Sequence, residues 1–227
     1  MDIERISTEA TDTKVSAVQL QELDLRDPQA NVIVADTRYE DHQFLSIFER
    51  LRHTLGLIRI SSNRVLYEAP VPKPKGSRGA PRKHCHPFQL SEPARSENRN
   101  EMFQLGKQTV QVKAWHNLHF KKLATLVGSP LRVEFLKEDG SPRYKRPIWL
   151  FWTGSQSVVL SDSCRLYLWR FAIEHLFRFL KQHMGLGSNR SPSLVSAQQW
   201  MWLCALAYWR LLLMRDAVQA DRPAWYP

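Results

Sequence analysis

The sequence lacks the features of secreted, disulfide-stabilised and membrane-spanning proteins. Its three cysteines, Cys85, Cys164 and Cys204, lie far apart and form no C-x-x-C pair, so the sequence predicts neither a disulfide framework nor a structural zinc site. The N-terminus is acidic and has no apolar signal segment. The longest apolar stretch, 200–214, is too short to cross a bilayer and contains Arg210. These absences favour a cytoplasmic protein without a membrane partner.

The chain is basic and rich in aromatic side chains. Its 227 residues are 43% hydrophobic and 24% charged, which is typical of a folded globular protein. Lys and Arg number 32 against 22 Asp and Glu, giving a net charge of +10, and 11% of the residues are aromatic. A cationic chain with many flat side chains favours a polyanionic partner, most simply nucleic acid.

The positive charge is concentrated in residues 51–149. Within them, residues 73–84 place cations among Pro, Gly and Ser, a composition that excludes a helix or a central strand and indicates a mobile basic loop. We expect Arg78, Arg82 and Lys83 in this loop to contact DNA phosphates. A solvated surface loop with no such role is the alternative.

The spacing of apolar residues predicts helices and strands in alternation near the N-terminus. In chain order it predicts a helix over 13–25, a buried strand over 32–35 that ends at Asp36, a helix over 41–54 and a strand over 57–60. A strand, helix, strand order is typical of α/β proteins.

The middle of the chain has a different pattern of apolar residues. Short alternating segments at 64–67, 108–115, 131–135 and 148–152 predict a β-rich inserted subdomain, and two helices over 161–183 and 195–216 follow it. We therefore expect five parts: a disordered N-terminus (1–12), an α/β part (13–60), the basic insertion (61–155), C-terminal helices (156–216) and a tail (217–227).

The first late helix carries a polar stripe. At 100° per residue, one narrow face of this helix holds Tyr167, Arg170, Glu174, Arg178 and Lys181. The opposite face is apolar and is expected to be buried; it includes Trp169, Ile173, Leu176, Phe177 and Leu180. One carboxylate thus lies among cations. A ladder of i,i+4 ion pairs on a solvated face is the structural alternative.

The stripe resembles a known family signature. The spacing Y-x2-R-x3-E-x6-K, which falls here on Tyr167, Arg170, Glu174 and Lys181, resembles the Y-R-E-K signature of DDE-type insertion-sequence transposases. Asp36, at the end of an apolar strand, resembles the second aspartate of that family. Segments 78–84 and 115–119 resemble one group of these transposases, and the likeness covers residues 12–215.

This resemblance implies a fold and a reaction. It implies an α/β (α+β) RNase H-like domain, incomplete here, with a β-rich insertion and C-terminal helices. It also implies cleavage and strand transfer at the ends of double-stranded insertion-sequence DNA, with Mg²⁺ or Mn²⁺ held by Asp36 and Glu174 as the catalytic carboxylates. Tyr167, Arg170 and Lys181 would then bind phosphates, and Arg178 shares their stripe. The alternative for Asp36 is a cap on the following helix.

The family's first aspartate has no counterpart in the sequence. It lies on a strand well before the second aspartate, yet residues 1–30 contain no strand-like apolar run. We therefore expect this chain alone to be catalytically incomplete, which leaves open whether it is an enzyme. The missing strands would also leave an uncovered edge on the strand at 32–35, which predicts a marginal or oligomeric product.

Two further possibilities concern partners and function. The expected protein partners are a second copy of the chain or a full-length transposase. If the resemblance misleads, the alternatives are a non-enzymatic nucleic-acid-binding module or a regulatory fragment of such a transposase.

Two smaller motifs lie in the insertion. Trp115, flanked by Lys113 and His116, is a candidate to stack on an unpaired base, with a place in the core as the alternative. The His-Cys-His run at 84–86 predicts no zinc site, because adjacent residues on an extended segment point in different directions and no second pair of ligands exists.

Overall fold

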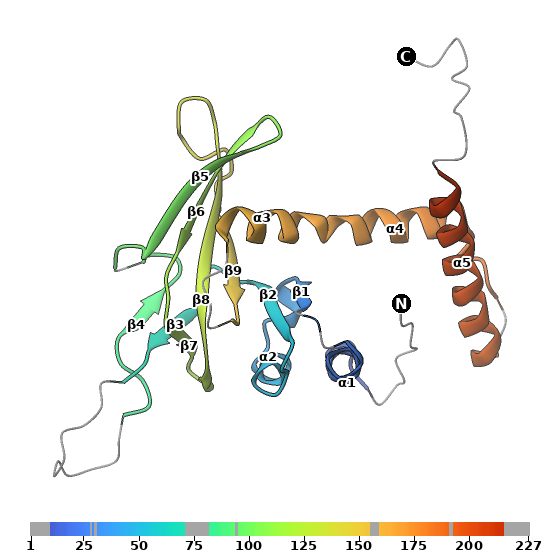
Figure 1. Cartoon of the computed structure of the whole chain (residues 1–227), viewed down its shortest axis with the longest axis horizontal. Helices are drawn as coiled ribbons and strands as arrows, with labels where there is room; N and C mark the ends of the chain where they lie inside the picture. The colour runs from blue at the N-terminus through green and yellow to red at the C-terminus, as the bar shows by residue number, and fades with distance from the viewer. Residues whose placement is uncertain are drawn as a thin grey trace. The chain divides into compact units, whose positions relative to one another are not determined.

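The computed structural model describes residues 10–27, 29, 31–70, 82–93, 95–154, 159–190 and 193–215. They fall into two compact units, one formed by Glu9–Arg170 and one that contains the helices from Phe171 onward. Arg78, the tail at 217–227 and most of the predicted N-terminal segment lie outside the described residues. Each unit is described below by itself, with the element labels of Figure 1.

The predicted first helix is confirmed as α1 (Asp12–Arg26). The Thr11 side chain caps it by accepting a hydrogen bond from the Lys14 N–H at 3.4 Å. Asp12 in its first turn and Arg26 in its last turn complement the helix dipole. Of its apolar residues, Leu20 is buried, whereas Leu25 is 85% exposed, so the helix contacts the unit along a narrow face.

The predicted strand before Asp36 is confirmed as β1 (Asn31–Ala35), and the predicted second strand is longer, as β2 (Thr54–Ile60). The helix predicted over 41–54 is wrong in length. It consists of α2 (His42–Leu45) and a 3-10 turn (Ser46–Glu49), because β2 already begins at Thr54. The Phe48 ring packs over Gly56 of that strand, where a Cβ would come within 2.8 Å of it.

Among the described residues, nine strands form one sheet in the order β1-β2-β9-β8-β7-β3-β4, with β5 and β6 joined to it at β8. β1 and β2 are parallel, and the other pairs are antiparallel. β8 (Leu123–Leu136) pairs with β7 (Leu118–Phe120) along its first half and with β6 (Gln108–Ala114) along its second. The remaining strands are β3 (Val65–Glu68), β4 (Pro87–Gln89), β5 (Arg99–Leu105) and β9 (Ile148–Trp152).

Side-chain alternation gives the sheet two buried faces. Val32 and Val34 of β1 pack into the cluster under α3 (Leu160–Trp169). Ile33 and Ala35 belong to the other face. That face is covered by α1, α2 and the 3-10 turn after α2, which together contribute Leu20, Phe44, Leu45 and Phe48. A mixed sheet with helices on both faces confirms the predicted α/β class and is consistent with an RNase H-like fold.

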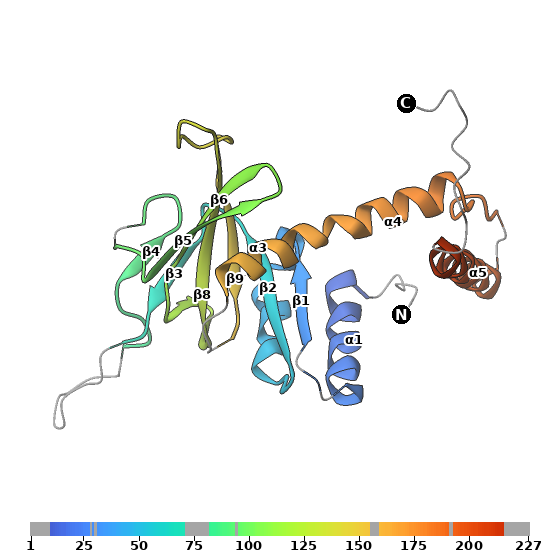
Figure 2. The same cartoon turned by 45° about the horizontal axis from the view of Figure 1, so that its top comes forward.

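The outer side of β1 pairs with no strand among the described residues. Helix α1 lies next to it in Figures 1 and 2, and its Ala17 and Leu20 pack into the cluster that Ile33 of β1 borders. Covering by a helix is one way in which proteins protect a sheet edge. The edge that the sequence predicts to be uncovered is therefore flanked by α1.

The second unit consists of α4 (Phe171–Gln182) and α5 (Leu194–Met214). After α4 the chain reverses at Gly185, whose φ of 66° suits glycine, and the Leu186 N–H donates to the Leu180 carbonyl. The Trp200 indole donates to the Gly185 carbonyl at 2.9 Å. Leu180 is buried here, but Ile173 is 52% exposed, so the prediction of a fully buried apolar face is wrong within this unit.

Candidate active site

Asp36 follows the last residue of β1, at the end where the parallel strands β1 and β2 both terminate. Alternation along β1 places it on the same face as Val34, which is the face that α3 covers. The same rule places Arg59 of β2 with Leu57 on that face. Strand geometry thus brings a carboxylate and a guanidinium beneath α3.

The two oxygens of the Asp36 carboxylate have different neighbours. Oδ1 accepts a hydrogen bond from the Arg38 N–H at 2.9 Å, which caps the 3-10 turn Thr37–Tyr39. Oδ2 lies 3.8 Å from a guanidinium nitrogen of Arg170. The capping role that the sequence left open is therefore confirmed for one oxygen, while the other, on a side chain that is 43% exposed, faces a cation.

Tyr167 on α3 organises the cations around Asp36. Its ring is buried, and its hydroxyl accepts a hydrogen bond from the Arg59 guanidinium at 3.3 Å. The guanidinium of Arg170 lies over the same ring, 5.6 Å from its centroid. The stacking and the hydrogen bond fix both arginines beside the strand end that carries Asp36.

The sequence analysis does not include Arg59 in the site, although the sequence contains a signal for it. Arg59 is the single charge inside the buried strand β2, next to the strand that ends at Asp36. A charge in such a strand needs a partner. Alternation along the two strands would have placed it on the Asp36 face.

The rest of the polar stripe lies in the second unit. Glu174, Arg178 and Lys181 are all exposed on α4, and their spacing puts them on one face of that helix. The helix predicted over 161–183 is present as α3 and α4, which meet in the chain at Arg170.

Of the other predicted DNA contacts, Arg82 and Lys83 are exposed. Trp115 has the alternative role that the sequence analysis gives for it, which is a place in the core. It is 2% exposed, its ring packs against Phe88 and Trp149, and its indole donates to the Arg95 carbonyl at 3.0 Å. Because its faces are covered, Trp115 is a core residue rather than a platform for a base.

Two other aspartates near the N-terminus have structural partners. Asp12 forms an ion pair with Arg38. Asp24 is buried, and its carboxylate accepts hydrogen bonds from the backbone N–H groups of Arg52 and His53 at 2.9 and 2.8 Å. Burial by itself raises the pKa of Asp24, but these hydrogen bonds outweigh it and hold the pKa below its ordinary value.

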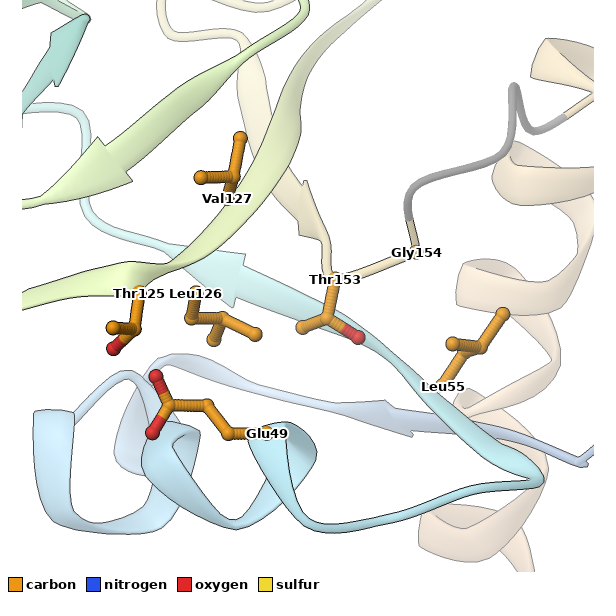
Figure 3. Close-up of a pocket in the computed structure, with 7 residues that line it drawn as sticks. All are labelled: Glu49, Leu55, Thr125, Leu126, Val127, Thr153 and Gly154. Carbon is orange, nitrogen blue, oxygen red and sulfur yellow. The ribbon is translucent and has the colours of Figure 1, made fainter. Parts of the chain in front are cut away.

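A cavity of about 680 Å³ lies elsewhere in the first unit. Figure 3 shows its lining, in which Glu49 supplies the only carboxylate and Leu55 marks the first part of β2. Leu55 pairs with Val32, near the start of β1, whereas Asp36 follows the end of that strand. The cavity is therefore at the opposite end of the parallel strands from Asp36.

The site thus consists of a carboxylate at the end of an edge strand and an arginine at the end of the helix that covers it, in an α/β protein. The family model described as the transposase DDE domain matches residues 7–210, and the chain belongs to this family. No curated protein matches the chain. The family acts in DNA transposition, binds DNA and generally uses divalent metal ions. No described helix is both long enough and apolar enough to cross a bilayer.

Proposed function

We propose that this chain carries the second aspartate and the glutamate of a transposase catalytic domain that cleaves and joins double-stranded DNA at insertion-sequence ends. The observation that supports this most directly is the placement of Asp36 at the end of β1, facing Arg170 directly after α3. The family match over residues 7–210 supplies the reaction class.

Asp36 can offer one carboxylate oxygen to a hard divalent cation, since only its Oδ1 accepts the Arg38 N–H. Carboxylate oxygens are the ligands that Mg²⁺ prefers. Oδ2 of Asp36 is on a partly exposed side chain, and the nearest guanidinium nitrogen of Arg170 is 3.8 Å away. In the proposal, Asp36 and Glu174 hold Mg²⁺ or Mn²⁺. The bound ion would supply charge stabilisation for the attacking and leaving oxygens at phosphorus.

The remaining residues act on the DNA backbone. Arg170 and Arg59 are held in place by Tyr167, so they present their charge to a phosphate with little loss of side-chain freedom. Arg178 and Lys181, on one face of α4, would bind further phosphates. Arg82, Lys83 and Arg78 add phosphate contacts from the basic segment.

The phosphate contact is tested by measuring DNA affinity over a range of salt concentrations without divalent metal. We expect Arg170→Ala to weaken binding and to reduce the slope of log K against log salt by about 1, as for the loss of one phosphate contact. Arg165→Ala is the matched control, since Arg165 is on the same helix but pairs with Asp162. An unchanged slope for Arg170→Ala would remove Arg170 from the interface.

The metal site is tested by thermal unfolding with and without Mg²⁺. We expect Mg²⁺ to raise the Tm of the wild-type chain, and Asp36→Asn and Glu174→Gln to abolish the increase. A DNA-binding module without a metal site would bind DNA normally and be indifferent to both substitutions. That result would contradict the proposal.

The proposal also includes catalytic incompleteness. Within the described part of Glu9–Arg170, the one group of three potential metal ligands is Glu68, Cys85 and His86, which does not include Asp36. We therefore expect the purified chain to leave insertion-sequence ends uncut. Metal-dependent cleavage that Asp36→Asn abolishes would disprove this part.

A further inference from the structure

The ends of strands β3 and β4 bring three metal-ligating side chains together. The Cys85 N–H donates to the Glu68 carbonyl at 2.9 Å, and the Glu68 N–H donates to the His86 carbonyl at 3.2 Å. These two backbone hydrogen bonds fix the register of Glu68 against the residues that lead into β4. Glu68 therefore adds a ligand from a second segment. The sequence analysis of the His-Cys-His run does not identify this residue.

The donor atoms converge on one point. Sγ of Cys85 lies 3.3 Å from Nδ1 of His86, and the same Nδ1 lies 3.4 Å from Oε2 of Glu68. All three ligand atoms lie within 4.8 Å of one another. A tetrahedral zinc ion with bonds of about 2.0–2.3 Å separates its ligand atoms by about 3.3–3.7 Å. The two distances to Nδ1 of His86 match this range.

Hydrogen bonds within this cluster do not satisfy all three side chains at once. Nδ1 of His86 has either one proton or one lone pair, so it can serve only one of the thiol and the carboxylate at a time. A cation placed between the three groups would satisfy all of them. Thiolate, imidazole and carboxylate are together the ligand types of zinc.

Arg95 orients the carboxylate. Its guanidinium binds Oε1 of Glu68 at 2.5 Å and the His116 carbonyl at 2.7 Å. Oε2 is thereby left facing His86. An outer partner that fixes a ligand in this way is a regular feature of metal sites.

We propose that Glu68, Cys85 and His86 bind Zn²⁺, with the fourth position taken by water, since the His86 side chain is 83% exposed. Binding requires the Cys85 thiol to lose its proton to the solvent. The ion would join the two ends of residues 69–84, which include Lys73, Lys75 and Arg78. This site is separate from Asp36 and does not depend on the function proposed above.

The test is a Co²⁺ titration of the full chain, followed by displacement with Zn²⁺. We expect one thiolate-bound Co²⁺ per chain, with a thiolate-to-cobalt absorption band that Cys85→Ser abolishes, and an affinity of this site that Glu68→Gln and His86→Gln each lower at least tenfold. Cys204→Ser and His183→Gln are the controls and should leave the band unchanged. Cobalt bound without a thiolate band, or a band that survives Cys85→Ser, would overturn the proposal.

A second measurement needs no variant. Zn²⁺ should slow the alkylation of Cys85 by iodoacetamide at least tenfold, as followed by mass spectrometry. Cys164 and Cys204 are buried thiols in the same chain and serve as internal references. An alkylation rate of Cys85 that is the same with and without Zn²⁺ would contradict the site even if a variant failed to fold.

Discussion

Asp36 and Arg170 face each other at the end of β1, with Oδ2 of the carboxylate 3.8 Å from a guanidinium nitrogen. Asp36 follows β1, whereas Arg170 comes directly after α3, the helix that covers this face of the sheet. The carboxylate also caps a turn through Oδ1. Its structural and its proposed catalytic roles therefore use different oxygens, and they can be separated by substitution.

We expect Asp36→Ala to lower the free energy of unfolding by about 1 kcal/mol in the absence of metal, because it removes the cap on the turn Thr37–Tyr39. Asp36→Asn retains an oxygen that can accept the Arg38 N–H, so its cost should be clearly smaller. Urea unfolding of both variants measures the difference. Equal losses for the two variants would show that the charge, and not the cap, stabilises this segment.

Asp24 should make stability depend on pH in the acid range. Its pKa is lower in the folded state than the ordinary value of 3.8, so the unfolded chain takes up the proton first. The stabilisation is complete above pH about 3.8 and is lost as the pH falls through the lower folded-state pKa. We expect Asp24→Asn to cost about 1–3 kcal/mol near neutral pH, since an amide cannot accept both backbone hydrogen bonds.

Urea unfolding between pH 3 and 7 measures this effect. The difference between wild type and Asp24→Asn should shrink at the acid end of that range. Glu22→Gln on the exposed face of the same helix is the control and should show little change. A difference that stays constant with pH would mean that the Asp24 charge contributes nothing.

Trp115 should behave as a core residue. Trp115→Ala removes the ring between Phe88 and Trp149, and we expect it to cost about 3–5 kcal/mol. Trp115→Phe should cost less, because it keeps an aromatic ring in the core and loses the hydrogen bond to the Arg95 carbonyl and part of the packing. Fluorescence anisotropy with DNA should give the wild-type affinity for folded Trp115→Phe. A loss of affinity without a loss of stability would restore the base-stacking role.

Helix α1 should protect the outer side of β1. Leu20 anchors α1 in the core, and Leu20→Ala should cost about 2–5 kcal/mol and increase self-association, measured by size-exclusion chromatography with light scattering. Leu25→Ala, at a position that is 85% exposed, is the control. If the Leu20→Ala protein remains monomeric while α1 is released, the edge of β1 does not drive association.

The elements with strong local signals could be predicted from the sequence. The apolar run before Asp36 predicts β1, and the polar stripe beginning at Tyr167 predicts the helical region and the family. The helix over 41–54 could not be predicted in length, because its end depends on where β2 begins and on the packing of Phe48 over Gly56. Local periodicity contains no information on either contact.

Sequence alone determined the mixed α/β class, the charge and the family, since these depend on composition, periodicity and spacing along the chain. Only the tertiary structure decided which side chains meet. Arg59 joins Tyr167 and Glu68 joins Cys85 because strand pairing and helix packing bring together residues that are distant in sequence. Trp115 became a core residue for the same reason, since Phe88 and Trp149 reach it from other strands.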